Sequence, residues 1–293
     1  YLMGVIGEAD VRFGSGLSDG SHSWSQIAGD LPQRKLIRSV EQDNEKRALL
    51  FAGTEFGICA TVDGGKHWVK LSGGVPTISF RDIEIQEREA DLVGASFGRS
   101  FFILDDYSPL RDINDQSLEK ETLLFPVKKA LLYIEQRPLQ DKGKAFMGDA
   151  FYLAPNPPFG AVFTYYLKES LKTGAEARRE EEKKLDKEGK PIPFPGWDKL
   201  RKEEAEEKPG IVLTVTDESG QVVRRVAGPA SKGIHRVAWD LRYPAVEPIE
   251  PETSEREEWR GQPEGPLVVP GPFAVSLAKK VAGTLVSPGP SNT

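Results

Sequence analysis

The stretch of residues 53–68, GTEFGICATVDGGKHW, decides the fold of the first part of this chain. Its second half reads Thr-x-Asp-x-Gly-x-x-Trp, with Thr61, Asp63, Gly65 and Trp68 at the fixed positions. The Asp63 carboxylate can accept hydrogen bonds from the amides of its own turn, and Gly65 can take a positive φ. Trp68 would then begin the next strand and bury a large aromatic face. The stretch therefore predicts a tight hairpin between two strands.

The same pattern occurs a second time, nearer the N-terminus. The run from Asp19 to Trp24, DGSHSW, aligns with Asp63 to Trp68, with a serine in place of the glycine. The two aspartates are 44 residues apart, and each tryptophan is followed at the same spacing by an aliphatic residue and a proline. A period of about 40–50 residues is typical of β-propeller blades built from four strands. The repeat therefore predicts about two blades.

Residues 1–106 carry short apolar runs separated by Gly, Asp, Asn and Pro, which is typical of an all-β region. Residues 1–5 resemble the middle of a strand and do not begin with Met, so we expect residue 1 to be an internal position of a longer product. Further strands are predicted at residues 35–40, 48–53, 57–62, 68–71, 80–86, 92–96 and 101–104.

Several phrases resemble those of large bacterial sortilin-like or BNR-repeat (Asp-box) β-propeller proteins, which are often labelled glycosyl hydrolases. They are GTEFGI, the Thr61–Trp68 box, DLVGASFGRSFFILDD at residues 91–106 and YSPLRDI at residues 107–113. In that family a Gly-Arg-x4-Leu-Asp-Asp segment closes the propeller, and Ser-Pro-Leu-Arg leads out of it. The resemblance implies that the chain contains the last blades of a propeller, at residues 1–106.

The same resemblance assigns the propeller closure to four residues of this chain: Gly98, Arg99, Asp105 and Asp106. We expect Arg99 to form a buried pair with Asp105 or Asp106, with a structural rather than a catalytic role. The threonine and histidine that usually precede this segment in the family are serine and phenylalanine here. This change removes one histidine from any candidate site.

Residues 107–122 are predicted to be a linker, and residues 123–293 a β-sandwich. Apolar and polar residues alternate at 211–216 and 235–240, which suits strands with one buried face. The phrases SKGIHRVAWDLRYP and GPLVVPGPFAVSL are similar to the Ig-like or fibronectin-like module that follows the propeller in the same family. Trp239 is expected to anchor the core. Strands are predicted at residues 123–126, 130–134, 162–167, 211–216, 222–226, 234–241 and 273–277.

A charged insertion at about residues 168–208 interrupts the predicted sandwich. Residues 175–188 and 199–207 favour two helices, with a Glu180–Lys184 pair, Gly189 ending the first helix and Asp198 capping the second. We expect a solvated arm, with a partner-binding arm as the alternative. Its large apolar residues are expected to pin it to the sandwich: Phe194, Trp197 and Leu200.

The composition argues against several classes of function. The 293 residues carry a formal net charge of −6, which disfavours a nucleic-acid partner. No apolar run approaches the ~20 residues of a membrane-spanning helix. Cys59 lies in a predicted strand and is expected to be a small buried side chain. Of the three histidines, His22 and His67 are expected to be exposed in the two turns, and with His235 they are too scattered for a metal site. No metal and no cofactor is predicted.

No catalytic residue is predicted either. A glycosidase needs two carboxylates flanking its sugar site. Asp19 and Asp63 hold turns and are therefore assigned a structural role. Glu55 lies at the end of a predicted strand, and nothing in the sequence supplies a partner for it.

The main functional hypothesis is a non-catalytic binding or scaffold protein outside the cytoplasm, with a protein or glycan ligand. One alternative is a carbohydrate-active hydrolase whose catalytic residues lie in blades missing from this chain. Another is a sortilin-like peptide receptor. The expected partner is the remainder of the propeller, from the same gene product or another chain, packed along the faces of residues 35–40 and 48–53.

Overall fold

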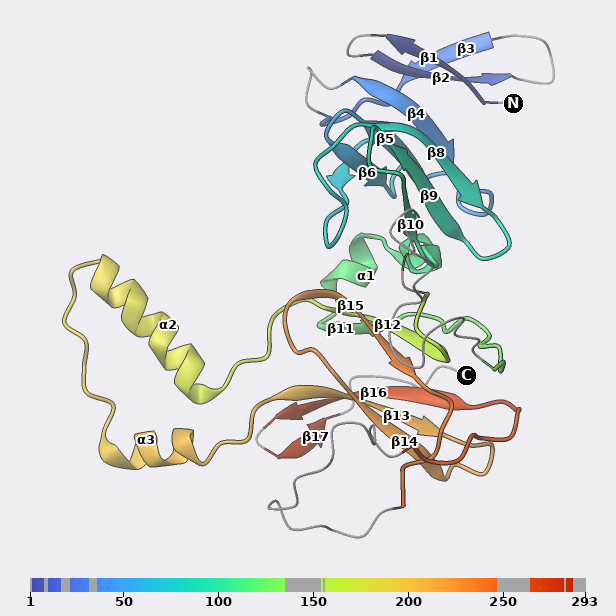
Figure 1. The fold of residues 1–293 in the computed structure, drawn as a ribbon. Helices are drawn as coiled ribbons and strands as arrows, with labels where there is room; N and C mark the ends of the chain where they lie inside the picture. Colours follow the sequence, from blue (N-terminus) through green and yellow to red (C-terminus); the bar gives the residue numbers. More distant parts are fainter. Residues whose placement is uncertain are drawn as a thin grey trace. The chain divides into compact units, whose positions relative to one another are not determined.

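The computed structural model describes residues 2–7, 10–16, 22–31, 36–134, 154, 156–246, 264–281 and 283–286, with side chains from residue 27 onward. The chain divides into two compact units, Tyr1–Leu118 and Glu119–Thr293. Both consist mainly of antiparallel sheets, as Figure 1 shows. In the described part of the chain, no helix combines the length and the apolar character needed to cross a membrane.

The first unit contains three antiparallel sheets, and within each sheet the strands follow one another along the chain. The described sheets do not close into a barrel or a ring. The all-β character predicted for this region is thus confirmed. The strands are β1 (Leu2–Gly7), β2 (Asp10–Gly16) and β3 (His22–Gln26); β4 (Ile37–Gln42), β5 (Leu50–Thr54), β6 (Gly57–Thr61) and β7 (Val69–Lys70); β8 (Phe80–Gln86), β9 (Asp91–Ser96) and β10 (Phe101–Leu104).

The middle sheet, β4 to β7, has side chains packed on both of its faces. Every residue of β5 and β6 is buried. Phe51 packs on one face in a cluster with Phe80 of β8. On the other face, Cys59 and Trp68 pack with the partly buried Ile27. Cys59 is therefore the small buried side chain that the sequence predicts.

The face available to a further sheet differs from the sequence expectation. Residues 35–40 and 48–53 are predicted to meet further blades, but β5 is wholly buried within the unit and β4 is buried or half-buried. The exposed apolar face lies on β10, where Phe101 and Ile103 are 67% and 60% exposed. The intervening side chains of β10 pack into the core, because alternate residues of a strand point to opposite faces.

The segment after β10 is ordered, although the sequence predicts a linker at residues 107–122. A 3-10 helix spans Ser108–Asp112, and a short helix, α1, spans Asp115–Glu119. Tyr107 is fully buried against Phe51, with ring centroids 4.9 Å apart in an edge-to-face arrangement. Up to Leu118 the segment belongs to the first unit.

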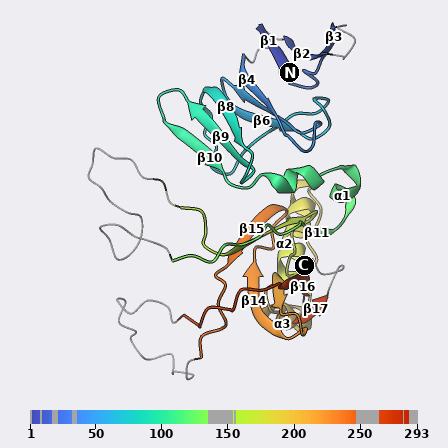
Figure 2. The same cartoon turned by 90° about the vertical axis from the view of Figure 1, so that its right-hand side faces the viewer.

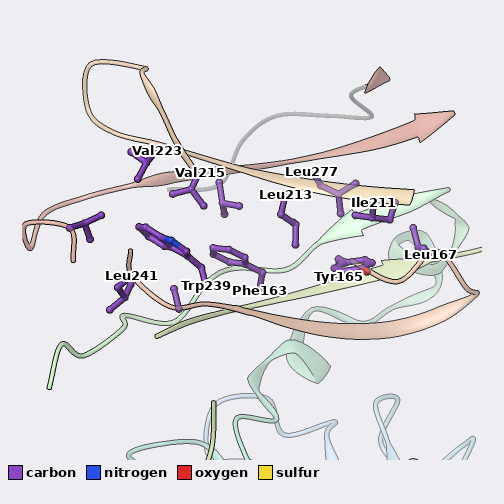
Figure 3. Packing of buried hydrophobic residues seen from close by; sticks show 13 residues of the cluster. Phe163, Tyr165, Leu167, Ile211, Leu213, Val215, Val223, Trp239, Leu241 and Leu277 are labelled. Atoms are coloured by element: carbon purple, nitrogen blue, oxygen red, sulfur yellow. The ribbon is translucent and has the colours of Figure 1, made fainter. Parts of the chain in front are cut away.

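The second unit contains two antiparallel sheets that lie in separate layers (Figure 2). One has the strand order β11-β12-β15, the other β14-β13-β16-β17. Figure 3 shows side chains of the two sheets meeting in one core, among them Phe163, Trp239 and Leu213. Trp239 is buried there, as predicted. The strands are β11 (Thr122–Leu124), β12 (Ala161–Leu167), β13 (Gly210–Thr216), β14 (Val222–Gly228), β15 (Gly233–Trp239), β16 (Ala274–Val281) and β17 (Thr284–Val286).

Gly160 permits the close approach of two chain segments at the start of β12. Its φ is 105°, and a Cβ at this position would lie 1.9 Å from the Trp239 carbonyl oxygen. Only glycine fits there without a shift of the backbone. The glycine at this position therefore has a packing reason as well as a conformational one.

One predicted strand, at residues 130–134, is absent. β11 ends at Leu124, and the Phe125 amide donates one more hydrogen bond, to the Thr164 carbonyl oxygen. The chain then continues without regular structure to residue 134. Apolar composition alone favours a strand here, but none of the described sheets includes residues 130–134.

The insertion forms two helices, α2 (Gly174–Lys187) and α3 (Trp197–Glu204). A capping box between Thr173 and Glu176 begins α2. Gly189, at a φ of 66°, ends it as predicted. The residue that precedes α3 as its N-cap is Gly196, so the prediction of Asp198 is wrong.

Ion pairs hold the two helices to each other rather than to the sheets. Arg178 pairs with Glu182 on its own helix and with Glu203 on α3, at 2.9 Å for the second pair. The predicted pair of Glu180 is made with Lys172 instead of Lys184. Neither helix contains a buried residue.

The aromatic residues of the arm do not pin it to the sandwich. Phe194 and Trp197 are 64% and 70% exposed, and their ring centroids lie 5.3 Å apart in an edge-to-face arrangement. Leu200 is half-buried. The sequence expectation for Phe194 and Trp197 is therefore wrong.

Deleting residues 173–207 and joining the ends with a short Gly-Ser bridge should leave the second unit folded. Neither deleted helix contains a buried residue, and replacing one surface loop by another changes the loop entropy little. Thermal unfolding followed by circular dichroism should show a midpoint within a few degrees of the parent. Loss of the cooperative transition would mean that the arm is part of the core.

Candidate functional site

The Asp63 carboxylate organises the turn between β6 and β7. Its Oδ1 accepts hydrogen bonds from the Lys66 amide at 3.0 Å, the His67 amide at 3.1 Å and the Thr61 hydroxyl at 2.7 Å. Its Oδ2 lies 2.7 Å from Nδ1 of the exposed His67. The Gly65 amide donates to the Thr61 hydroxyl. Thr61 and Asp63 together accept from the amides of Gly65, Lys66 and His67.

The turn also packs against the segment that follows β3. The Trp68 amide donates to the Asp30 carboxylate at 2.7 Å, and its indole Nε1 donates to the Ile27 carbonyl at 3.0 Å. Gly65 has a φ of 92°, and a Cβ there would lie 2.6 Å from the Ile27 carbonyl oxygen. Gly65 and Trp68 thus hold the turn against the segment that follows β3.

These contacts keep the Asp63 carboxylate ionised. Partial burial raises its pKa, but hydrogen bonds from Thr61 and from the His67 and Lys66 amides more than offset this and hold the pKa well below its usual range. The hydrogen bond to Asp63 in turn raises the pKa of His67. A carboxylate held in this state cannot donate a proton near neutral pH.

The other residues singled out in the sequence lie apart from one another. Asp19 is outside the described residues. Trp24 lies in β3 opposite Gly14, and His22 begins the same strand rather than a turn. Glu55 pairs with Arg38 at 3.5 Å, so its partner is a guanidinium and not a second carboxylate.

The predicted buried pair at the closure segment is wrong. Gly98 and Arg99 are exposed in the turn between β9 and β10, and Gly98 has a φ of 74°. Asp105 is half-buried after β10. Asp106 accepts a hydrogen bond from the Ser108 hydroxyl and thereby shapes the start of the 3-10 helix.

In this unit, a buried ion pair is instead formed by Asp43 and Arg111. Asp43, in the turn between β4 and β5, is 2% exposed. The Tyr107 hydroxyl donates to its Oδ1 at 2.7 Å, the Arg111 Nη2 donates to Oδ1 at 2.8 Å, and the Lys46 amide donates to Oδ2 at 2.7 Å. Arg111 also pairs with Glu45 at 2.7 Å. This cluster around Asp43 fastens the segment after β10 to the middle sheet.

The ionisation states of this cluster are fixed by its geometry. Burial raises the pKa of Asp43. Hydrogen bonds from Arg111 and Tyr107 lower this pKa by more than burial raises it, so the net shift is downward. Burial and the Asp43 carboxylate raise the pKa of Tyr107. The sequence contains no signal for this pairing, since Asp43 and Arg111 are 68 residues apart.

One acidic side chain does titrate near neutral pH. Partial burial, followed by the negative charges of Glu84 and Asp82, raises the pKa of Glu41 to about 7. Glu41 lies on β4, while Glu84 and Asp82 lie on β8. Sequence reasoning did not find Glu41, because its environment depends on the packing of two strands about forty residues apart.

The described residues contain no group of three or more His, Cys, Asp or Glu side chains placed to hold a metal ion. A carboxylic acid with a pKa near 7 is suited to act as a general acid.

Comparison with known proteins gives little further guidance. No protein-family model and no curated protein sequence matches this chain significantly. Among solved structures, the chain is similar to the extracellular domain assigned to a one component system, BT4673 from B. thetaiotaomicron, at 12% identity. The alignment has a TM-score of 0.26 and covers 98% of this chain and 29% of that protein. A likeness at this level defines neither the fold nor the function of the chain.

Replacing Asp63 by alanine should lower the free energy of unfolding at pH 7 by about 1–3 kcal/mol, because three turn donors lose their acceptor. Urea unfolding measures the difference. Lys66→Ala, an exposed change in the same turn, is the matched control and should leave stability nearly unaltered. Equal stabilities of the Asp63 and Lys66 variants would contradict the structural role.

Replacing Glu41 by glutamine should stabilise the fold only at high pH. The folded protein holds a proton at Glu41 that the unfolded chain, with a pKa of 4.5, has released, so the contribution of Glu41 is lost as pH rises through about 7. Glu41→Gln should raise the free energy of unfolding by about 1–2 kcal/mol at pH 8, allowing for solvent screening, and hardly at all at pH 4. Glu87→Gln, at an exposed position after β8, is the control. An equal effect at both pH values would contradict the shift.

Proposed function

We propose that this chain is part of a non-catalytic binding or scaffold protein located outside the cytoplasm, with a protein or glycan as its ligand. The observation that carries the proposal is the exposed aromatic pair of Phe194 and Trp197. Large aromatic side chains that the fold does not bury are typical of interaction surfaces. Tryptophan is among the residues most often found at the energetic centre of an interface.

The surroundings of this pair favour binding. Phe194 lies in the run Pro191-Ile192-Pro193-Phe194-Pro195, and the prolines restrict the backbone between the two helices. Ile192 is exposed as well. A segment that is restricted before it binds loses less conformational entropy on binding. The charged faces of α2 and α3 supply a polar rim around the apolar centre.

We further propose that the first unit is the closing part of a sortilin-like, BNR-type propeller. Three successive antiparallel sheets and the hydrogen-bonded Asp63 turn support this proposal. The exposed face of Phe101 and Ile103 is suited to packing against a further blade of the same gene product or of another chain. A sortilin-like peptide receptor would use such additional blades. The location outside the cytoplasm is inferred from the same resemblance.

A second candidate function is a carbohydrate-active hydrolase, and Glu41 is the observation that favours it. Glycosidases pair a protonated carboxylic acid with an ionised carboxylate. Glu41 holds its proton up to about pH 7, and Glu84 and Asp82 supply the negative charge nearby. In this candidate, Glu41 would donate the proton to the leaving group.

One experiment that combines a binding assay with a hydrolysis assay separates the two functions. The chain is applied to arrays of immobilised glycans and peptides, and to p-nitrophenyl glycosides between pH 4 and pH 8. We expect binding without turnover, and we expect the double change Phe194→Ala/Trp197→Ala to weaken binding by at least about tenfold. Phe56→Ala, at an exposed aromatic position of the first unit, is the matched control.

The outcomes differ clearly. Unaltered binding by the double variant would contradict the role of the aromatic pair. Turnover that disappears in Glu41→Gln would establish the hydrolase instead. Because both aromatic residues are exposed, the double variant should fold as the parent does, and circular dichroism checks this.

A further inference from the structure

The second unit contains a cavity between its two sheets. Its volume is about 540 Å³, within the ~300–1,000 Å³ of pockets that hold small molecules. Ala161, Phe163 and Trp239 line it from the sheet of β12 and β15, and Val215 and Val275 line it from the opposite sheet. The cavity thus adjoins the apolar core.

The cavity lies at one end of that core. Figure 3 shows Val215, Trp239 and Leu241 gathered at this end, away from Tyr165 and Leu167 at the other. Well-packed interiors contain few voids larger than a water molecule. A space of this size at one end of an otherwise packed core therefore suggests an occupant.

The segment after β11 forms one side of the cavity. Residues 127–132 line it, and the strand predicted from residue 130 onward is absent. Leu131 is 64% exposed, and Leu132, Tyr133 and Ile134 are exposed as well. An apolar run beside an apolar cavity provides additional surface that a bound hydrocarbon would cover.

The walls offer carbon contacts rather than hydrogen bonds. The indole Nε1 of Trp239 donates to the Arg242 carbonyl oxygen at 3.0 Å, so its one polar atom is already used. Phe273 stands edge-to-face against Trp239, with ring centroids 5.3 Å apart. A sugar would leave its hydroxyl groups without partners against such walls. The part of a ligand inside the cavity is therefore hydrocarbon.

The charge of the residues that line the cavity favours a ligand with a negatively charged head group. Lys129 lies on the segment that forms the side of the cavity, and it is exposed. Among the described lining residues there is no aspartate or glutamate. We propose that this cavity binds a long-chain carboxylate, with its alkyl chain between the sheets and its carboxylate beside Lys129. The proposal is independent of the function proposed for the whole protein.

The test is calorimetric titration of the whole, delipidated chain with dodecanoate, tetradecanoate and hexadecanoate below their micellar concentrations. Each added methylene should lower Kd about fourfold as long as the cavity accommodates it. Dodecyltrimethylammonium has a chain of the same length with the opposite charge, and it should bind at least about tenfold more weakly than dodecanoate. Equal binding of the two would overturn the charge assignment.

Substitutions in the lining test whether the carboxylate binds in this cavity. Ala161→Leu and Ala130→Phe fill the cavity from two different sides, and each should weaken dodecanoate binding by at least about tenfold. Lys129→Glu should weaken dodecanoate and strengthen the cationic surfactant. Lys120→Glu, an exposed change in the same unit, is the matched control and should alter neither. Circular dichroism and thermal unfolding identify the variants that fold.

Three results would overturn the proposal. One is the absence of saturable binding of any of the three carboxylates, which is also the result expected if another part of the chain fills the cavity. Another is undiminished binding by whichever cavity-filling variant folds. The third is equal weakening by Lys129→Glu and Lys120→Glu, which would indicate a general charge effect.

Discussion

The first unit depends on one buried charge. Asp43 lies in a water-poor environment, where an ionised carboxylate is tolerated only if donors surround it. Tyr107, Arg111 and the Lys46 amide supply those donors, and the Lys46 ammonium in turn donates to the carbonyl oxygens of Arg111 and Ile113. Lys46 and Arg111 thus bind each other as well as Asp43. The segment after β10 cannot leave the middle sheet without exposing this set to water or leaving Asp43 unpaired.

The same reasoning decides which carboxylates remain available for chemistry. Asp63 and Asp43 both have lowered pKa values, because the surrounding hydrogen bonds outweigh burial. Glu41 is partly buried near Glu84 and Asp82, so the nearby negative charges add to the effect of burial and its pKa rises. Local donors therefore separate structural carboxylates from one that can exchange a proton near neutral pH. This difference is invisible in the sequence, where all three are acidic residues beside predicted strands.

Sequence reasoning succeeded where structure is local. The strands at residues 80–86 and 101–104 have the predicted bounds, since turn residues and alternating apolar positions lie within a few residues of one another. It failed where the outcome depends on distant partners. Arg99 was paired with a neighbouring aspartate, but the buried pair is made by Arg111 with a residue 68 positions away. The expectation that Phe194 and Trp197 pin the arm to the sandwich is wrong, because both side chains remain exposed between the charged helices.

The absent strand at residues 130–134 has a consequence for the second unit. A strand there would have turned alternate apolar side chains into the core. Instead the regular pairing with β12 ends after the Phe125 amide, and residues 130–132 line an open space beside Phe163 and Trp239. Apolar residues without a partner strand are costly in water unless something covers them. The loss of one predicted strand and the presence of a cavity are therefore two aspects of one feature, and a ligand in that cavity would provide the contacts that the strand does not.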